Sequence, residues 1–420
     1  MLWRPAMSAS APLVAARSVA AQSVHARPPV ILQVLPSLQA GGVERGTIEM
    51  VRAVAAAGGI PLVASAGGRM VSQVRRAGGR HITLRLMTKD PLGICMNAWW
   101  LARLIRREHV DLVHARSRAP AWSAWLAARR TRTAFVTTWH GAYSENLPFK
   151  KRYNAIMARG ERVIAISRFV AARLQADYAV GPDRLRIIPR GADLAMFDPA
   201  AIRGDRLHAL ASDWNLPFGA KVIMLAGRIT PWKGHELLLR ALARLPAATD
   251  RIAGAPAWVC VLVGPRQREG THADTLLALA HDLGLMKRLR FAGHCDDMPA
   301  AYALADIVVV PSLKPEPFGR VVIEAQAMGR PVLVAGHGGA SETVEDGVSG
   351  TVFPPGDVEA LAQALARLLA LDDVEREALA LRARAHVAEH YGLPAMQQST
   401  LAVYDELLCR QSDPPRWRAS

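Results

Sequence analysis

The sequence is poor in cysteine and contains no cysteine motif. Its 420 residues include only four cysteines, Cys95, Cys260, Cys295 and Cys409, and no two of them have C-x-x-C spacing. Neither a disulfide framework nor a structural zinc site is therefore indicated, and we expect a cytoplasmic protein. The chain also lacks any run of about 18 uninterrupted apolar residues, which excludes an integral membrane protein.

Two further motifs are missing. No Asp-x-Asp is present, so the carboxylate pair that would hold Mg²⁺ or Mn²⁺ against a diphosphate is absent, and we expect no metal site. No G-x-G-x-x-G follows the first predicted strand, which argues against a dinucleotide-dependent oxidoreductase.

Acidic residues are scarce in the N-terminal half. Residues 1–200 hold 29 Lys and Arg against 11 Asp and Glu, whereas residues 201–420 hold 23 against 25. This asymmetry suggests that the N-terminal half faces a membrane, a phosphorylated glycan or nucleic acid, although an Arg-rich composition also spreads solvated charge without a binding role. Because no nucleic-acid module or aromatic interleaving accompanies the charge, we expect no nucleic-acid partner.

Short apolar segments alternate with helical patterns along the chain. The first predicted strand begins near Val30, and a loop ending in Gly41-Gly42 leads into a helical pattern over 43–57. The alternation continues through "LRIIPRGAD" and restarts at "AKVIMLAGRI". It predicts an α/β protein with two Rossmann-like, doubly wound parallel-sheet domains, whose strand carboxyl ends face one ligand-binding cleft.

The same patterns suggest domain limits. Residues 1–27 are expected to be a disordered tail or an upstream start-site error, and 28–200 the N-terminal Rossmann-like domain. Residues 201–217 lose periodicity and are predicted to be a linker, and 218–393 the C-terminal Rossmann-like domain. A last helix over 394–410 is expected to pack back on the N-terminal domain.

Two carboxylates flank a predicted helix start in "SLKPEPFGRVVIEAQAMGRPVL". Glu316 is predicted to lie in a loop after a strand, and Glu324 in the first turns of a helix that begins near Arg320. The free N–H groups at that helix start favour a phosphate, so Glu324 could accept hydrogen bonds from a ribose and Glu316 could reach a sugar ring. Taken alone, both carboxylates could instead simply favour the helix dipole.

Two cations follow the first strand of the second domain, in "AGRITPWKGHELLL". Arg228 and Lys233 lie on a strand-to-helix loop and are expected to face the cleft. A guanidinium suits bidentate phosphate contacts and an ammonium supplies a point charge, so the pair could bind a diphosphate and stabilise it as a leaving group. Solvated surface charge is the alternative.

Taken together, these motifs resemble those of the retaining family-4 glycosyltransferases, which have the GT-B fold. The resemblance runs from about Val30 to about Leu408. In chain order its motifs are GGVER (41–45), TTWHG with His140, IAISRF, IIPRGADLAMF, the pair Arg228 and Lys233, and the pair Glu316 and Glu324.

The resemblance implies that 28–200 is the acceptor-side domain and that 218–393 binds the nucleotide-sugar, and it implies how this donor is bound. Gly41 and Gly42 would let the backbone approach the donor diphosphate, which Arg228 and Lys233 would bind. Glu324 would hold the nucleotide ribose.

The resemblance also implies which residues meet the transferred sugar. Glu316, with the backbone of Phe318 and Gly319, would contact that sugar, and His140 would lie near its reacting carbon. A core histidine packed under Trp139 is the alternative for His140.

Two positions on the N-terminal side are less defined. The family often has Asn-Gly where this chain has Arg190-Gly191, which leaves the role of Arg190 open. His114 and Arg116 end a predicted strand and are expected to line the acceptor side.

The function implied by the resemblance is a retaining, metal-independent glycosyltransferase without a cofactor. Its donor would be a nucleotide-sugar, with UDP as the commonest base, and its acceptor a cell-envelope glycan or glycolipid such as a lipopolysaccharide core. The alternatives are a non-catalytic nucleotide-sugar or anionic-glycan binder and a sugar-nucleotide epimerase on a related fold.

A membrane contact is predicted from "ENLPFKKRYNAIMARGER" (145–162). Lys150, Lys151 and Arg152 would give this helix a cationic start. Four side chains can share one apolar face: Phe149, Tyr153, Ile156 and Met157. We expect either peripheral association with the cytoplasmic face of the inner membrane or an ordinary core helix.

Overall fold

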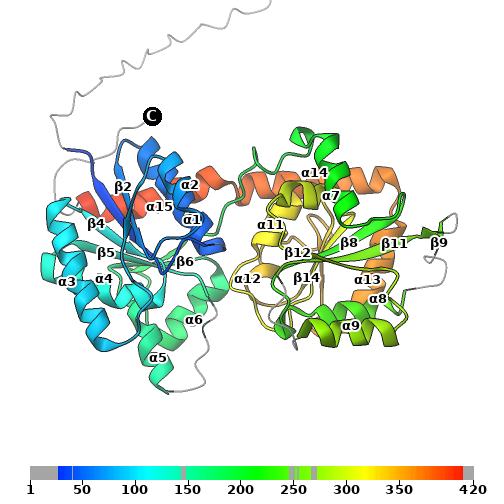
Figure 1. The fold of residues 1–420 in the computed structure, drawn as a ribbon, viewed down its shortest axis with the longest axis horizontal. Coiled ribbons are helices and arrows are strands. Elements are labelled where there is room, and N and C mark those ends of the chain that lie inside the picture. The colour runs from blue at the N-terminus through cyan, green and yellow to red at the C-terminus, as the bar shows by residue number, and fades with distance from the viewer. Residues whose placement is uncertain are drawn as a thin grey trace, which may run out of the picture.

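The protein folds into two α/β domains (Figure 1). The computed structural model describes residues 27–39, 41–141, 143, 148–245, 251–252, 255–265 and 272–409. All of the expected tail except Arg27 lies outside these ranges. No helix in the part of the chain so described is long and apolar enough to cross a bilayer.

The N-terminal domain is built on a seven-stranded sheet in the order β3-β2-β1-β4-β5-β6-β7. Every neighbouring pair is parallel, and β1 places Ile31 opposite Pro61 of β2 and Leu112 of β4. The strands are β1 (Val30–Val34), β2 (Ile60–Ser65), β3 (Arg80–Thr83), β4 (Leu112–Ala115), β5 (Ala134–Trp139), β6 (Arg162–Ala165) and β7 (Leu185–Ile187). Its helices are α1 (Gly42–Ala56), α2 (Val71–Arg76), α3 (Pro91–Arg107), α4 (Arg118–Thr131), α5 (Pro148–Asn154), the 3₁₀ turn η1 (Ala155–Ala158) and α6 (Arg168–Tyr178).

The C-terminal domain repeats this plan with six parallel strands in the order β12-β11-β8-β13-β14-β15. The strands are β8 (Lys221–Ala226), β11 (Trp258–Val263), β12 (Leu289–Gly293), β13 (Ile307–Val310), β14 (Val332–Ala335) and β15 (Thr351–Phe353), and a small antiparallel ribbon joins β9 (Arg251–Ile252) to β10 (Ala255–Pro256). The helices between the strands are η3 (Pro231–Lys233), α8 (His235–Leu242), α9 (His272–Asp282), α10 (Met298–Leu304), α11 (Arg320–Ala327) and α12 (Gly338–Ser341), and α13 (Val358–Ala370) follows the last strand.

The stretch predicted to be a linker, 201–217, contains a helix. After the turn η2 (Pro199–Ala201), α7 (Gly204–Asp213) packs against α10, and Arg206 donates to both carboxylate oxygens of Asp297, at 2.9 and 2.6 Å. None of the residues of α7 is fully buried. Gly204 and Pro217, which begin and follow this segment, favoured a linker in the sequence, although the helix itself is amphipathic.

The chain crosses between the domains twice, and the two crossings touch. After α14 (Asp373–His390) on the C-terminal domain, the N–H of Leu393 donates to the carbonyl of Ala192 at 2.9 Å. A Cβ at Gly191 would lie 2.5 Å from the Cα of Leu393, so the close crossing requires glycine there. The final helix, α15 (Leu393–Leu408), then packs on the N-terminal domain, where Tyr404 joins its core.

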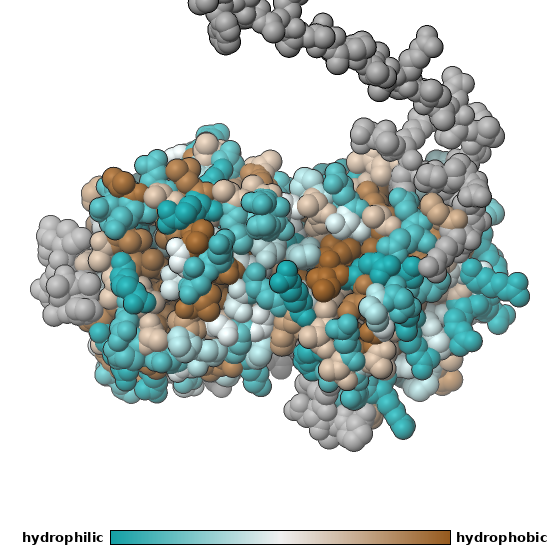
Figure 2. All heavy atoms as spheres, turned by 180° about the vertical axis from the view of Figure 1, so that it is seen from behind, coloured by the Kyte–Doolittle hydropathy of each residue, from teal (hydrophilic) through white to brown (hydrophobic). Residues whose placement is uncertain are grey.

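The predicted fold class is confirmed: both sheets are doubly wound and parallel, as the GT-B resemblance implies. In each domain the strand order reverses beside the first strand, β1 or β8, which creates a binding crevice at the carboxyl ends of the strands. Seen from behind, hydrophilic and apolar side chains are interspersed over both domains (Figure 2).

Candidate active site

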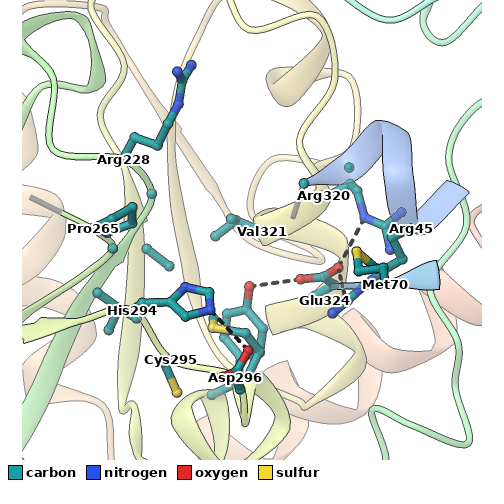
Figure 3. A pocket seen from close by; sticks show the side chains of 18 of the residues that line it. Arg45, Met70, Arg228, Pro265, His294, Cys295, Asp296, Arg320, Val321 and Glu324 are labelled. Carbon is teal, nitrogen blue, oxygen red and sulfur yellow. Dashed lines mark hydrogen bonds and ion pairs between the residues drawn. The ribbon is translucent and has the colours of Figure 1, made fainter. Parts of the chain in front are cut away.

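A cleft of about 620 Å³ lies between the two domains. On the C-terminal side its lining comes from the residues that follow β8, β11 and β12 and from the start of α11. On the N-terminal side it comes from the starts of α1 and α2. The strand carboxyl ends thus meet the cleft as the doubly wound topology requires. Figure 3 shows Arg45, Arg320 and Glu324 grouped together, with Arg228 extending away from them.

The start of α1 is open to an anion. Gly41 has φ +138°, and no side chain caps the helix, so its first N–H groups are not occupied by a side-chain acceptor. Gly42 faces α11 so closely that a Cβ there would lie 3.4 Å from Cδ of Arg320. Both glycines line the cleft, where free helix N–H groups and the positive end of the helix dipole favour a phosphate.

Arg228 and Lys233 both follow β8 but point to different partners. Arg228 lines the cleft, is exposed and makes no ion pair with another residue that the structure describes. Lys233 is largely buried and turns toward Glu316, with 2.7 Å between Nζ and Oε1. Since an ammonium has three N–H donors, this contact leaves two for another acceptor.

The backbone around Glu316 is tightly fixed. The N–H of Gly339 donates to the carbonyl of Glu316 at 2.6 Å, and a Cβ at Gly338, with φ +70°, would lie 2.7 Å from that same carbonyl. The Ser312 hydroxyl donates to the Glu316 carboxylate. Neither residue of this pair is part of the cleft lining, but Lys233 lies directly beside it, since a Cβ at Gly227 in the lining would lie 3.4 Å from Lys233 Cε.

Glu324 is buried at the cleft and accepts from several donors. The hydroxyl of Tyr302 donates to Oε2 at 3.1 Å, and Nε of Arg320 donates to Oε1 at 3.2 Å. Arg45, from the opposite domain, approaches Oε1 at 3.5 Å. Burial and the adjacent Glu324 charge raise the pKa of Tyr302 well above its usual value, so the phenol remains a donor at neutral pH.

Helices α1 and α11 are linked crosswise by charge. Arg45 on α1 approaches Glu324 on α11, while Glu49 on α1 accepts from Arg320 on α11 at 3.0 Å. Burial works against the charged form of Glu49, but Arg320 and Arg190 outweigh it and lower its pKa. Glu49 is therefore ionised at neutral pH and holds the two domains together at the cleft.

Arg190 completes this cluster from the loop after β7. It is buried and donates to Glu49 at 3.2 Å, and a Cβ at Gly46 would lie 1.5 Å from its guanidinium. Burial lowers the pKa of Arg190 and Glu49 works in the opposite direction, while Arg116 and Arg320 add repulsion. The role left open by the sequence is thus structural in this conformation: Arg190 anchors Glu49.

The sequence alone did not single out Arg45, Glu49, Arg320 or Tyr302. A signal was present, since Arg45 and Glu49 are four residues apart on α1, and Arg320 and Glu324 are four apart on α11. Such spacing indicates a charged face on each helix, but it does not show which other helix that face contacts.

His140 lies directly after β5. Its Nε2 is buried and has no hydrogen-bond partner among the residues that the structure describes. Burial, together with the positive charges of Arg116 and Arg190, lowers the pKa of His140 well below its usual value, so the imidazole is neutral at neutral pH. His140 is not part of the cleft lining.

Phe318 and Gly319 lead into α11. The Phe318 ring is buried and packs edge-on against Tyr391, 6.1 Å between centroids. Gly319 precedes the first turn of α11, which has no side-chain cap, so the backbone N–H groups there remain for a ligand. The hydroxyl of Ser167 donates to the carbonyl of Pro317 at 2.6 Å and ties this loop to the N-terminal domain.

The expectation that His114 and Arg116 line an acceptor site is wrong, because both side chains are buried. Nδ1 of His114 pairs with the Tyr404 hydroxyl and its Nε2 with Thr138 Oγ1, both at 2.7 Å, and the ring is fully buried. Arg116 is also buried and donates to Gln33 at 3.0 Å. Both side chains stabilise the domain beneath the cleft.

For 145–162 the structure supports the core alternative at two of the four apolar positions. Helix α5 ends at Asn154, and the turn that follows buries Ile156 and Met157 in the core. Phe149 is exposed, as are Lys151 and Arg152. The turn η1 packs against α4, and this contact buries its apolar side chains inside the domain. Glu145 and its neighbours through 147 lie outside the described residues.

Another contact between the two domains lies within the cleft lining. Arg69 of the N-terminal domain approaches His294 Nε2 at 2.9 Å, and the same nitrogen lies 3.0 Å from Asp296. In the described part of the chain, no group of three or more His, Cys, Asp or Glu side chains could hold a metal ion.

Two family models match the chain, one in each domain. Residues 40–196 match the model described as Glycosyltransferase Family 4, and residues 210–386 match Glycosyl transferases group 1. Together they include every residue of the crosswise cluster.

Similar proteins extend this finding. A D-inositol 3-phosphate glycosyltransferase from Salinispora tropica is 34% identical over 71% of this chain and 64% of its own length. One from Actinosynnema mirum is 34% identical over 71% of this chain and 73% of its own length.

Solved structures agree over almost the whole chain. A glycosyltransferase from Rickettsia africae has 35% identity and a TM-score of 0.82, covering 91% of this chain and 99% of that one. HepE from Anabaena, in complex with UDP and glucose, has 25% identity and a TM-score of 0.76, covering 90% of this chain and 100% of that one.

Proposed function

Because this chain belongs to the family-4 glycosyltransferases, we propose that it transfers a sugar from a nucleoside-diphosphate sugar to an acceptor hydroxyl. One observation carries the proposal. The cleft has an uncapped helix start on each side, at Gly42 and Arg320, with Arg228 in its lining and the buried carboxylate of Glu324 between them.

This arrangement suits a nucleoside diphosphate. The N–H groups that begin α1 and α11 would donate to phosphate oxygens, and Arg228 would add a bidentate contact. Glu324 would accept from the ribose hydroxyls, while Arg45, at the longest of the three contacts to Glu324, would give way.

Two groups would act on the transferred sugar. Glu316, fixed by Lys233 and the backbone of Gly339, would accept from sugar hydroxyls. Neutral His140 has a free Nε2 with which to bond a hydroxyl near the reacting carbon. Arg228 and Lys233 would stabilise the charge that accumulates on the departing diphosphate, so the proposal needs no metal ion.

We further propose UDP as the nucleotide, because the similar HepE structure contains UDP and glucose. The acceptor is proposed to carry an anionic group, since the N-terminal half is strongly basic. A phosphorylated envelope glycolipid and an inositol phosphate both fit this chemistry, and the relatives' names favour the second. We extend the proposal to retention of anomeric configuration on the family resemblance.

Transfer assays with UDP-glucose test these statements. The acceptors are inositol 3-phosphate and a phosphorylated glycolipid, and each assay contains EDTA. Proton NMR identifies the anomer of the product. An α-linked product from the α-linked donor supports the proposal. A β-linked product would contradict retention, and activity that returns only with Mg²⁺ or Mn²⁺ would contradict the metal-free site.

A further inference from the structure

The outward face of α3 carries four large apolar side chains that remain exposed. The exposed fractions are 82% for Leu92, 62% for Met96, 52% for Trp99 and 46% for Trp100. The helix lies at the end of the N-terminal domain that is farthest from the C-terminal domain (Figure 1). These side chains are therefore remote from the cleft and take no part in the proposed sugar transfer.

Helical geometry places these side chains together. Leu92, Met96 and Trp99 follow one another at spacings of four and three residues, so they form one stripe, and Trp100 lies beside Trp99 with 4.6 Å between ring centroids. The opposite face, which includes Leu101 and Ile105, is buried, and α3 packs closely against α4. The domain core is thus complete without the outward stripe.

The stripe continues into positive charge. Arg103 and Arg106 lie four and seven residues beyond Trp99 on the same face, and Arg107 lies seven beyond Trp100; all three arginines are exposed. Arg103 and Arg106 make no ion pair with another described residue, whereas Arg107 shares Glu108 with Arg80, and Asp90 caps α3 through the N–H of Gly93. Over 85–107 the chain has five basic residues and one acidic residue.

We propose that this α3 face, formed by Leu92, Met96, Trp99, Trp100, Arg103, Arg106 and Arg107, docks on an anionic lipid surface. Tryptophan suits the interface between headgroups and acyl chains, because its ring is apolar and its N–H is polar. When the apolar stripe enters the headgroup zone of a bilayer, the arginines that continue the stripe are placed to contact anionic headgroups. Two copies of this face would instead bring like charges together.

Vesicle co-sedimentation of the full chain tests the proposal. The wild-type protein is expected to bind vesicles of phosphatidylcholine with phosphatidylglycerol, to bind phosphatidylcholine alone weakly, and to dissociate as salt is added. Leu92→Gln, Met96→Gln and Trp99→Gln together should weaken the partition by at least about tenfold, because apolar area no longer enters the interface. Arg103→Gln, Arg106→Gln and Arg107→Gln should weaken it by roughly a hundredfold and remove the salt effect.

Matched controls come from the same chain. Val374→Gln with Leu381→Gln removes two exposed apolar side chains from α14 and should bind like the wild type, as should Lys150→Gln, Lys151→Gln and Arg152→Gln on α5. Circular dichroism checks that each variant is folded. Unchanged binding by a folded α3 variant, or no binding by the wild type, would overturn the proposal. So would a concentration-dependent dimer, in sedimentation velocity, that the Leu92, Met96 and Trp99 variant abolishes.

Discussion

The carboxylate of Glu324 makes three side-chain contacts, with Tyr302, Arg320 and Arg45. Two of these partners come from its own domain and fix the carboxylate at the cleft. Arg45 comes from the other domain and is the contact most easily exchanged for a ribose hydroxyl, because it is the longest and its side chain is partly exposed.

The Glu324→Ala variant is expected to raise KM for the donor. It leaves ribose hydroxyls without an acceptor, which costs about 1–3 kcal/mol, or roughly five- to 150-fold in affinity. Steady-state kinetics with varied donor measure the effect. Glu359→Ala, an exposed carboxylate paired with Arg244, is the control and should change nothing. A normal donor KM in the Glu324 variant would remove this carboxylate from the ribose.

Arg228 and Lys233 are expected to act mainly on kcat. Charge builds on the diphosphate as it leaves, so Arg228→Met and Lys233→Met should each lower kcat by about a hundredfold. Arg240→Met, an exposed cation on α8, serves as the control. If both changes together leave kcat intact, another group holds the diphosphate.

The sequence predicts the position of residues in loops that follow strands. Glu316, Arg228 and Lys233 each lie in a loop after a predicted strand, and the parallel topology brings such loops to one edge. The crosswise contacts of Arg45 and Glu49 could not be foreseen, because each fits an ordinary pair within its own helix and only the approach of the two domains decides the partner.

At the scale of elements, α15 shows how one helix secures a domain distant in sequence. Its Tyr404 bonds His114 in the core, and its Glu406 accepts from Arg162 and Arg186. The apolar pattern predicted α15, whereas α7 was assigned to a linker because of Gly204 and Pro217, although its own pattern is amphipathic. The exposed stripe on α3 has the same spacing as a core stripe, so its outward position is decided by packing alone.

The Tyr404→Phe variant is expected to destabilise the protein by about 1–3 kcal/mol, since it leaves His114 Nδ1 buried without its partner. Urea unfolding followed by circular dichroism measures this. Ser399→Ala, on the exposed side of α15, is the control. Equal stability of the two variants would show that the Tyr404 hydroxyl does not hold the helix.

For the whole molecule, the Glu49 cluster is expected to couple domain closure to pH. The pKa of Glu49 is lowered in the folded state from its usual 4.5. The contribution of Glu49 to folding stability is therefore fully present above pH 4.5, and it is lost as the pH falls through the lower pKa of the folded state. Small-angle scattering should therefore report opening of the cleft on acidification.

The Glu49→Gln variant should open the cleft already at neutral pH and flatten the acid dependence. Breaking a buried ion pair costs about 3–5 kcal/mol, so melting temperature should fall clearly as well. Glu108→Gln, which breaks a surface pair with Arg80 and Arg107, is the matched control and should cost about 0–1 kcal/mol. A closed Glu49→Gln protein with wild-type stability would contradict the coupling.

The most direct test is titration calorimetry of the full chain with UDP in the presence of EDTA, with GDP, ADP and CMP for comparison. The cleft is expected to bind UDP at one site without any divalent metal, and Arg228→Met and Glu324→Ala should each weaken that binding. Thermal unfolding provides the same readout, since UDP at about 100 times its dissociation constant should stabilise the protein by about 2.7 kcal/mol. Binding of none of the four nucleotides, or binding that depends on added Mg²⁺ or Mn²⁺, would contradict a cleft built from helix starts and cations.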